Sequence, residues 1–378
     1  MILLTLKPGY IHTELIPPVY HSTIAVKPHN PIFRAFNRVV GHMGGCYNSA
    51  MKVSELGEFG LIDLLAEIVS KPSPRQKLLI GIGDDAATWQ SHSGITLATT
   101  DSLIQGVHFT PDTTGWRDLG WKALAVSLSD IAAMGGTPLY ALVSLALPGN
   151  TEVDDVAELY KGVAEAADKF DVAIAGGDTD SSTIIVVNTA VFGSGQAGCL
   201  LTRSAASVGD KIAVTGWLGG AGGGLKMLTD KIKFAGKDTN ALKQAFHHPL
   251  PRIAEGQLLS QQGVKAAIDI SDGLLADLGH ICRQSRVGAR VDIDSVPVHP
   301  AVIAGFGDKA LDMALGGGED YELLFTASGD TIEKVKKAAS CQITIIGTIT
   351  DDIGNIKLAN KEGKPYTPAG VGWQHFRQ

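Results

Sequence analysis

Acidic residues stand at the ends of several short apolar segments of this chain. Apolar runs typical of buried strands alternate with longer stretches that carry apolar residues at helical spacing. The runs at 77–82, 95–100, 172–177 and 265–270 each end within two residues of an aspartate. In α/β sheets, ligands bind beyond the carboxyl ends of the strands. The pattern therefore predicts an α/β fold in which carboxylates converge on a ligand site.

The alternating segments divide into two units that join around residues 200–210, which is the simplest account of the pattern. Thr151, with Asp154 three residues later, resembles a capping box and predicts a helix start. In the first unit, strands are predicted at 77–82, 95–100, 139–147, 172–177 and 183–193, and helices at 116–134 and 151–170. In the second, strands are predicted at 211–216, 265–270, 321–327 and 342–349, with helices after the glycine-rich loop at 219–224 and from Ser271.

The composition excludes several classes of protein. A chain of 378 residues, 44% hydrophobic and 19% charged, is typical of a globular protein with about two domains. The net charge of -7 argues against a nucleic-acid partner and against a polybasic membrane anchor. No apolar run reaches the roughly 18 residues of a membrane span. The four cysteines are far apart, which fits a reducing, cytoplasmic location.

The first 50 residues or so have a different character from the rest. Prolines interrupt every short apolar run, and no basic segment or cleavage site of a signal peptide is present. Organised patterning begins at about Met51. We expect residues 1–53 to be a disordered extension or the result of an upstream start codon, with a partner-binding arm as the alternative.

The acidic residues allow two interpretations. So many carboxylates would repel each other, so they are either solvated turn residues or ligands of cations. For one aspartate after a strand a turn role is favoured, but for the whole set we favour a cation. Oxygen ligands without His or Cys suit Mg²⁺ rather than zinc or iron. The set comprises Asp84, Asp85, Asp101, Asp178, Asp180, Asp269 and Asp272, with Asp130 three residues after Ser127 on one helix face.

The glycine-rich loop at 219–224 lies between a predicted strand and a predicted helix, as a phosphate loop does. It is followed by Leu225 rather than Lys and Ser or Thr, so it is not a Walker A loop, and it does not match G-x-G-x-x-G. Two interpretations remain open. The helix start could attract an anion, or the glycines could serve close packing of the helix on the strand.

Several motifs together resemble those of the thiamine-monophosphate kinase family, which belongs to the aminoimidazole-ribonucleotide-synthetase-like superfamily. The resemblance runs in order from about residue 54 to the end of the chain, which makes it specific. The motifs are Gly57-Glu58-Phe59, Gly81-Ile82-Gly83-Asp84-Asp85-Ala86, Thr99-Thr100-Asp101-Ser102-Leu103, Lys122-Ala123-Leu124-Ala125-Val126 with Ser129-Asp130, Gly176-Gly177-Asp178-Thr179, Thr202-Arg203-Ser204, Ile268-Asp269-Ile270-Ser271-Asp272-Gly273-Leu274 and Gly317-Gly318-Glu319-Asp320-Tyr321-Glu322-Leu323.

This resemblance implies a two-domain fold of the α/β (α+β) class. An N-terminal domain at 54–205 would bind ATP and Mg²⁺ and dimerise through its sheet, and residues 206–378 would form a C-terminal α/β domain. The implied reaction is ATP-dependent phosphorylation of thiamine monophosphate to thiamine diphosphate, the last step of thiamine diphosphate biosynthesis, in a cytoplasmic homodimer.

The resemblance also implies roles for particular residues. None acts as a protein nucleophile or base, because positioning and metal electrostatics suffice for this transfer. The implied ligands of several Mg²⁺ ions are Asp85, Thr99, Thr100, Asp101, Asp130, Asp178, Asp269 and Asp272. The implied ATP contacts are Tyr160, Gly177, Asp178, Arg203 and Ser271, and the implied contacts of thiamine monophosphate are His108, Glu319 and Trp373.

Two other interpretations stay open. One is another ATP-using enzyme of the same superfamily, similar to a selenophosphate synthetase or a purine-pathway synthetase. Cys46 beside Gly44-Gly45 superficially resembles the reactive segment of the former, but it lies in the extension without an adjacent lysine. The other is a non-catalytic nucleotide or metal-binding module, which the number of aspartates in register makes the weaker choice.

Overall fold

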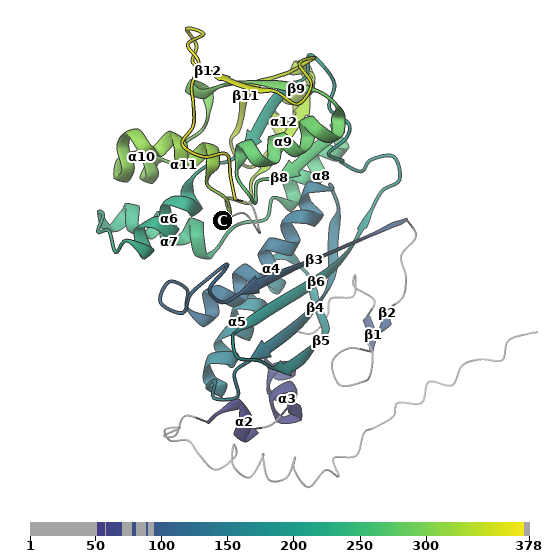
Figure 1. Ribbon diagram of the computed structural model, residues 1–378. Helices are drawn as coiled ribbons and strands as arrows, with labels where there is room; N and C mark the ends of the chain where they lie inside the picture. The colour runs from purple at the N-terminus through teal and green to yellow at the C-terminus, as the bar shows by residue number, and fades with distance from the viewer. Residues whose placement is uncertain (1–50, 57, 70–77, 81–87, 90–93, 374–378) are drawn as a thin grey trace, which may run out of the picture. The chain divides into compact units, whose positions relative to one another are not determined.

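The computed structural model describes residues 51–56, 58–69, 78–80, 88–89 and 94–373. The chain divides into two units, Met1–Ser49 and Ala50–Gln378, and only the second contains described residues. The predicted extension at 1–53 therefore lies almost wholly outside the described residues, and the domain boundaries at 53 and 205 stay predictions. Within the described part, two large sheets with helices on their faces confirm the predicted α/β fold (Figure 1).

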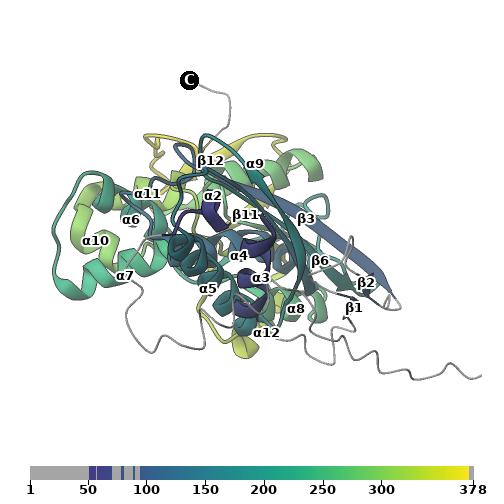
Figure 2. The ribbon, with the colours of Figure 1, turned by 90° about the horizontal axis from the view of Figure 1, so that it is seen from below.

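The first sheet has the order β3-β6-β4-β5 in the described residues. The β4 and β5 strands pair in parallel, and the other neighbours pair antiparallel. The helices α4 and α5 lie on one side of this sheet in both views (Figures 1 and 2). The bounds are β3 Ile95–Ile104, α4 Trp116–Ala133, β4 Thr137–Leu147, α5 Val153–Phe170, β5 Ala173–Ser181 and β6 Val186–Gly195, preceded by α2 Val53–Leu56, α3 Glu58–Ile68, β1 Leu78–Ile80 and β2 Thr88–Trp89.

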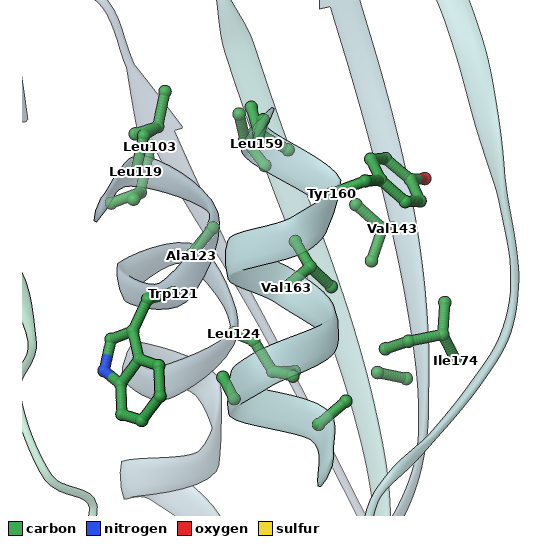
Figure 3. Packing of buried hydrophobic residues seen from close by; sticks show 14 of the residues in the cluster. Leu103, Leu119, Trp121, Ala123, Leu124, Val143, Leu159, Tyr160, Val163 and Ile174 are labelled. Atoms are coloured by element: carbon green, nitrogen blue, oxygen red, sulfur yellow. The ribbon is translucent and has the colours of Figure 1, made fainter. Parts of the chain in front are cut away.

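The core of this first layer lies between the two helices and the inner face of the sheet. Leu119 and Leu124 of α4 and Leu159 of α5 are at most 2% exposed (Figure 3). Residues alternate between the two faces of a strand, so Leu97 and Leu103 of β3 point to the helices while Ala98 and Thr100 stay exposed. The helix α4 is buried along most of its length.

Two glycines allow α4 and α5 to approach closely. A Cβ on Gly120 would lie 1.8 Å from the carbonyl oxygen of Leu159, and one on Gly162 would lie 1.9 Å from that of Arg117. Real atoms cannot come so near, and the obstacles are main-chain atoms that cannot rotate away. These glycines therefore set the distance between the helices that carry the core.

Replacing Gly120 by alanine should destabilise the protein, because the helices must separate and lose packing along their contact. We expect a loss of about 3 kcal/mol in the free energy of unfolding, at the upper end for overpacked sites, measured by urea denaturation. Gly236→Ala is the matched control, because nothing lies within 4 Å of its added Cβ. Equal stability of the two variants would contradict the close approach.

The second sheet has the order β12-β9-β11-β7-β10-β8 among the described strands. The β12 and β9 strands are parallel and the other pairs antiparallel. The strands are β7 Lys211–Thr215, β8 Ala266–Asp269, β9 Gly288–Asp292, β10 Leu323–Ala327, β11 Ile343–Thr350 and β12 Ile356–Ala359. The helices are α6 Gly220–Thr229, α7 Gly236–His247, α8 Ile253–Gln261, α9 Leu274–Ser285, α10 Pro300–Phe306, α11 Ala310–Gly316 and α12 Gly329–Ala338, with 3₁₀ turns at Ile293–Ser295 and Gly307–Lys309.

Apolar side chains cover both faces of the second sheet. One cluster joins α9 and α11 to the sheet, and the other joins α8 and α12 to its opposite face. Ala133, at the end of α4, belongs to the second cluster. The helix α4 therefore reaches from the first sheet to the edge of the second. No described helix has the length and apolar character needed to cross a membrane.

The predicted helix start at Thr151 is wrong in its detail. Glu152 is the residue that precedes α5, and no side chain caps that end of the helix. The amide of Thr151 donates to the carbonyl oxygen of Pro148 at 2.9 Å, so this residue completes a tight turn instead of capping.

Candidate functional site

Three of the predicted metal ligands meet where β3 faces α4. Thr99 and Asp101 occupy the inward positions of β3, and Asp130 lies near the end of α4. The Thr99 hydroxyl donates to Oδ2 of Asp130 at 2.5 Å, and the Ser127 hydroxyl donates to Oδ2 of Asp101 at 2.9 Å. Strand alternation and the helical spacing of Ser127 and Asp130 thus place two carboxylates side by side.

A third carboxylate reaches this group from the second sheet. Asp269 ends β8 and is only 2% exposed. Its Oδ2 accepts a hydrogen bond of 2.7 Å from the hydroxyl of Ser129, a buried residue of α4. Ser127 and Ser129, which lie two residues apart on α4, therefore hold carboxylates that belong to different sheets. We call Asp101, Asp130 and Asp269 the carboxylate cluster.

Burial and mutual repulsion make the carboxylate cluster costly to ionise without a cation. Burial and the charge of Asp130 raise the pKa of Asp101 to about 6. Burial and the same neighbour raise the pKa of Asp269 to about 7, while Ser129 and Arg203 act to lower it. A bound divalent cation would relieve this repulsion, and an oxygen-only donor set is the kind that Mg²⁺ prefers. The residues present therefore fit the predicted magnesium ions.

The turn after β8 continues the site. The amides of Ser271, Asp272 and Gly273 each donate to Oδ2 of Asp277 at 3.1 Å, which fixes the backbone that carries Asp272. Burial and the neighbouring Asp269 and Asp272 raise the pKa of Asp277 to about 8, against the effect of these amides. Asp277 thus organises the turn, although its own residue type suggested no role from the sequence.

The loop 317–322 lies directly beside this turn. The amide of Glu319 donates to the carbonyl oxygen of Ser271 at 2.8 Å, and that of Tyr321 donates to Ile270 at 2.9 Å. Glu319 and Tyr321 adopt positive φ angles of 67° and 49°. Such conformations are uncommon for residues with a side chain, and for a bulky one they indicate a turn or strain. The surrounding contacts hold the loop in this shape.

Each acidic side chain of the loop has a different partner. Oε1 of Glu319 lies 2.9 Å from Nζ of Lys122 on α4. Asp320 accepts from the amides of Gly219 and Ala221 at 2.6 and 3.1 Å. Glu322 accepts from Nε and Nη2 of Arg252 at 2.6 and 2.5 Å.

These contacts decide between the two interpretations of the glycine-rich loop. The acidic group at the start of α6 is the carboxylate of Asp320. Burial raises its pKa to about 7, although the two amides act to lower it. A Cβ on Gly224 would lie 2.3 Å from the carbonyl oxygen of Leu242, and one on Gly220 would lie 3.0 Å from Cβ of Ala245. The glycines therefore serve close packing of α6 on α7.

A cavity of about 390 Å³ opens next to Asp272. It is bordered by α9, by β12 and by the segment that leads to Trp373. The amide of Trp373 donates to the carbonyl oxygen of Asp272 at 2.9 Å, and its side chain is 54% exposed. His280 and Arg283 supply the basic side of the lining, and Oδ of Asp272, Oδ of Asp277 and a ring nitrogen of His280 lie within 4.8 Å of one another.

Known proteins are similar to this chain over most of its length. Residues 83–194 match the family model of the AIR synthase related protein, N-terminal domain, and residues 207–357 match that of the C-terminal domain. Thiamine-monophosphate kinase of Salmonella typhimurium is 38% identical over 328 residues, covering 85% of this chain and 98% of that protein. The Aquifex aeolicus enzyme of the same name is 35% identical, covering 86% of this chain and all of that protein.

This chain belongs to the thiamine-monophosphate kinase family. Solved structures agree. A crystal structure of thiamine-monophosphate kinase from Stenotrophomonas maltophilia has a TM-score of 0.71 at 36% identity, covering 81% of this chain and 95% of that one. A structure named as AaThiL complexed with AMPPCP and TMP has a TM-score of 0.67 at 33% identity, covering 86% of this chain and 99% of that one. The predicted family and the two-domain α/β fold of its superfamily are confirmed.

The described contacts bring together most residues that the resemblance to thiamine-monophosphate kinases singles out. Thr99 and Asp130 touch, the charge of Arg203 lowers the pKa of Asp269, and Glu319 and Trp373 bond to the main chain of the turn at 271–272. The residues gathered in this way are Thr99, Asp101, Asp130, Arg203, Asp269, Ser271, Asp272, Glu319 and Trp373.

Other members of the predicted set lie apart in the described contacts. The hydroxyl of Thr100 points to the outer face of the sheet, where it accepts from Nδ2 of Asn188 at 3.1 Å. Tyr160 is 6% exposed within the apolar core near Val143, where burial raises the pKa of its phenol (Figure 3). The ATP contact of Tyr160 and the metal contact of Thr100 stay predictions.

The remaining predicted residues lie apart from the carboxylate cluster in the described contacts or outside the described residues. The strand predicted at 172–177 continues to Ser181 as β5, so Gly177 and Asp178 lie in the middle of the strand and not beyond its end. Both are exposed, and the Asp178 carboxylate accepts from the amide of Thr179 at 2.9 Å. His108 lies in the turn after β3, where its Nδ1 accepts from the amide of Ile104 at 3.1 Å. Asp85 lies outside the described residues, so its role as a metal ligand stays a prediction.

The sequence analysis assigned no role to Ser129, Asp277 or Lys122. Ser129 directly precedes Asp130 and is fully buried. A serine among the apolar residues of this helix was the signal that could have pointed to it. Lys122 is a lysine within an otherwise apolar helical segment, which is a recognisable departure from the pattern of a core helix.

Proposed function

We propose that this protein transfers the γ-phosphoryl group of ATP to thiamine monophosphate and so forms thiamine diphosphate. The observation that carries this proposal is the carboxylate cluster, in which one helix holds acidic side chains from both sheets. Membership of the thiamine-monophosphate kinase family supports it, as does the similarity to the structure named as a complex with AMPPCP and TMP.

The cluster is proposed to hold several Mg²⁺ ions. The ligands within the described residues would be Asp101, Asp130 and Asp269 with Asp272 and Thr99, and the set would be completed by Asp85, Asp178 and Thr100. When bound, the ions would neutralise charge on the phosphates. The protein's own contribution is to keep the carboxylates in place through the hydroxyls of Thr99, Ser127 and Ser129.

No protein base is required for the proposed transfer. The acceptor is a phosphate monoester, whose second pKa of about 6 makes it largely dianionic near neutral pH. Phosphoryl transfer depends mainly on positioning and electrostatics. Arg203 lies close enough for its charge to act on Asp269, and a guanidinium can hold a phosphate by two parallel hydrogen bonds.

The two substrates are proposed to lie on either side of the cluster. Tyr160, Gly177, Asp178, Arg203 and Ser271 would contact ATP. His108, Glu319 and Trp373 would contact thiamine monophosphate, and the cavity beside Trp373 would take its cationic thiazolium ring. An aromatic ring facing a cationic ring contributes about 0.5–2 kcal/mol.

The assembly and the location are proposed as well. We infer a cytoplasmic homodimer formed through the outer face of the first sheet. Thr96, Ala98 and Thr100 are exposed on that face of β3, opposite the side that α4 and α5 cover. Small side chains at such positions allow two sheets to pack closely.

The proposal is tested by incubating the protein with thiamine monophosphate, ATP and MgCl₂ and separating the products by chromatography. We expect one thiamine diphosphate for each ADP, and no turnover when EDTA removes the metal. ADP formation that does not depend on thiamine monophosphate, without thiamine diphosphate, would favour another enzyme of the superfamily. Absence of both products would favour a non-catalytic binding module.

A further inference from the structure

Lys122 is a buried lysine in the first half of the chain that contacts side chains from the second half. It lies on α4 and is 1% exposed. Its Nζ lies 2.9 Å from Oε1 of Glu319 and 3.9 Å from the centre of the Phe246 ring. Both partners belong to the second half of the chain. Burying an ammonium is unfavourable unless it is paired. The contacts with Glu319 and Phe246 therefore offset the cost of burying the charge of Lys122.

The ion pair with Lys122 restricts the orientation of the Glu319 carboxylate. Glu319 sits in the loop 317–322 with a φ of 67°, and its amide bonds to Ser271 in the turn that carries Asp272. Its side chain is 23% exposed, so part of the carboxylate remains accessible to a ligand while Oε1 is held by the ammonium. The ion pair therefore fixes the direction in which the accessible part of the carboxylate points.

Phe246 holds the ammonium in this place. It is 1% exposed and lies near the end of α7, which contacts the same turn of α4. The following residues anchor that contact, because His248 lies 2.7 Å from Oδ1 of Asp118 and the Trp121 indole donates to the carbonyl oxygen of Pro249 at 3.0 Å. The face of an aromatic ring attracts a cation, so ring and carboxylate together define one position for Nζ.

We propose that Lys122 is a positioning residue for substrate recognition. It orients Glu319 so that the accessible carboxylate oxygen accepts a hydrogen bond from the exocyclic amino group of the substrate's aminopyrimidine ring. This inference rests on the proposed function, because it takes thiamine monophosphate as the substrate and Glu319 as its contact. Lys122 itself touches neither the phosphates nor the aminopyrimidine.

The alternative role for a buried lysine in a kinase is contact with a phosphate. Here the ammonium is already engaged by a carboxylate and an aromatic face, and the lysine is almost fully enclosed. A phosphate could reach it only if the side chains that enclose it moved aside. The geometry therefore favours an indirect role through Glu319.

Lys122→Met keeps much of the side-chain length and removes the charge. We expect the KM for thiamine monophosphate to rise about 10- to 100-fold, as for loss of a residue that orients a ligand-binding side chain. The KM for ATP and kcat should change less than about threefold. Lys169→Met is the control, because this exposed lysine also lies near an aromatic ring, at 5.8 Å from that of Trp121, and should leave all constants unchanged.

A double-mutant cycle tests whether Lys122 acts through Glu319. On the background of Glu319→Gln, the Lys122→Met change should raise the KM for thiamine monophosphate less than about twofold, because residues that act as one unit are not additive. If Lys122→Met does not fold, Phe246→Leu serves instead, with a smaller rise in the same constant. Additive effects, or an equal rise in the KM for ATP, would overturn the proposal.

Comparing the binding of thiamine with that of thiamine monophosphate distinguishes orientation of Glu319 by Lys122 from direct contact of Lys122 with the phosphate. Calorimetry with Lys122→Met should show the same fold loss of affinity for both ligands, since both carry the aminopyrimidine. A loss confined to thiamine monophosphate would place Lys122 on the phosphate and reject the inference. Failure of the proposed function would instead appear as a wild-type protein that forms no thiamine diphosphate.

Discussion

Replacing Asp130 by asparagine is expected to lower Mg²⁺-dependent turnover about a thousandfold or more, while the protein stays folded. Asp130 contacts Thr99, and its charge acts on both Asp101 and Asp269, which places it at the centre of the carboxylate cluster. Asparagine keeps the size of the side chain and its capacity to accept from Thr99, but it removes a negative charge. Single groups that stabilise charge in phosphoryl transfer contribute factors of this order.

The same change should not destabilise the metal-free protein. Removal of this carboxylate abolishes its repulsion with Asp101 and Asp269, so the Tm without metal should be equal to or above that of the wild type. MgCl₂ should raise the Tm of the wild type and not that of the variant, because ligand binding stabilises only the folded state. Asp101→Asn should behave in the same way.

The control for these variants is Asp154→Asn, an exposed acid in the first turn of α5. It should retain full activity and the normal response to MgCl₂. Near-normal turnover in either cluster variant would overturn the assignment of the metal ligands. Loss of turnover with an unchanged thermal response to Mg²⁺ would place the residue outside the metal site.

Arg252→Met is expected to lower the free energy of unfolding by about 3–5 kcal/mol, because it leaves a buried carboxylate without its cation. The Glu322 side chain is 8% exposed and receives two hydrogen bonds from Arg252 and a third, of 2.5 Å, from Thr215. After the substitution only the Thr215 hydroxyl remains among these partners. Urea denaturation measures the difference.

Two comparisons make this prediction specific. Arg117→Met breaks an exposed pair with Glu165 and should leave the urea midpoint unchanged, since water solvates both groups. Arg252→Met combined with Glu322→Leu should recover much of the lost stability, because apolar residues can replace a buried ion pair. If Arg252→Met alone were as stable as Arg117→Met, the buried pair would not contribute as argued.

The periodic segments of the chain were predicted well from the sequence. The helix expected at 116–134 appears as α4, and the strands expected at 139–147 and 211–216 appear as β4 and β7. Their patterns are long and unambiguous. The sequence analysis did not predict α7, α10 or α12, because such short helices depend mainly on tertiary packing for their stability.

The composition of the candidate site was also largely predictable, but its arrangement was not. The aspartates were recognised because acidic residues are unusual beside apolar segments, but Asp101 and Asp178 lie within β3 and β5 and not after them. Ser129 and Asp277 were missed because serines and aspartates are common in turns and on helices. Their role depends on Asp269 and on three backbone amides that only the folded chain brings near.

The sequence by itself determined which acidic residues accompany the apolar segments, how strands and helices alternate, and to which family the motifs point. These properties are local, because periodicity and motifs can be read within a few residues. Only the tertiary structure decided which acids meet, since Ser129 and Asp269 are 140 residues apart in the chain. It also decided that Asp320 occupies the glycine-rich helix start and that Lys122 faces Glu319. The physical reason is that buried charges and hydroxyls must find partners, and chain folding chooses those partners from distant segments.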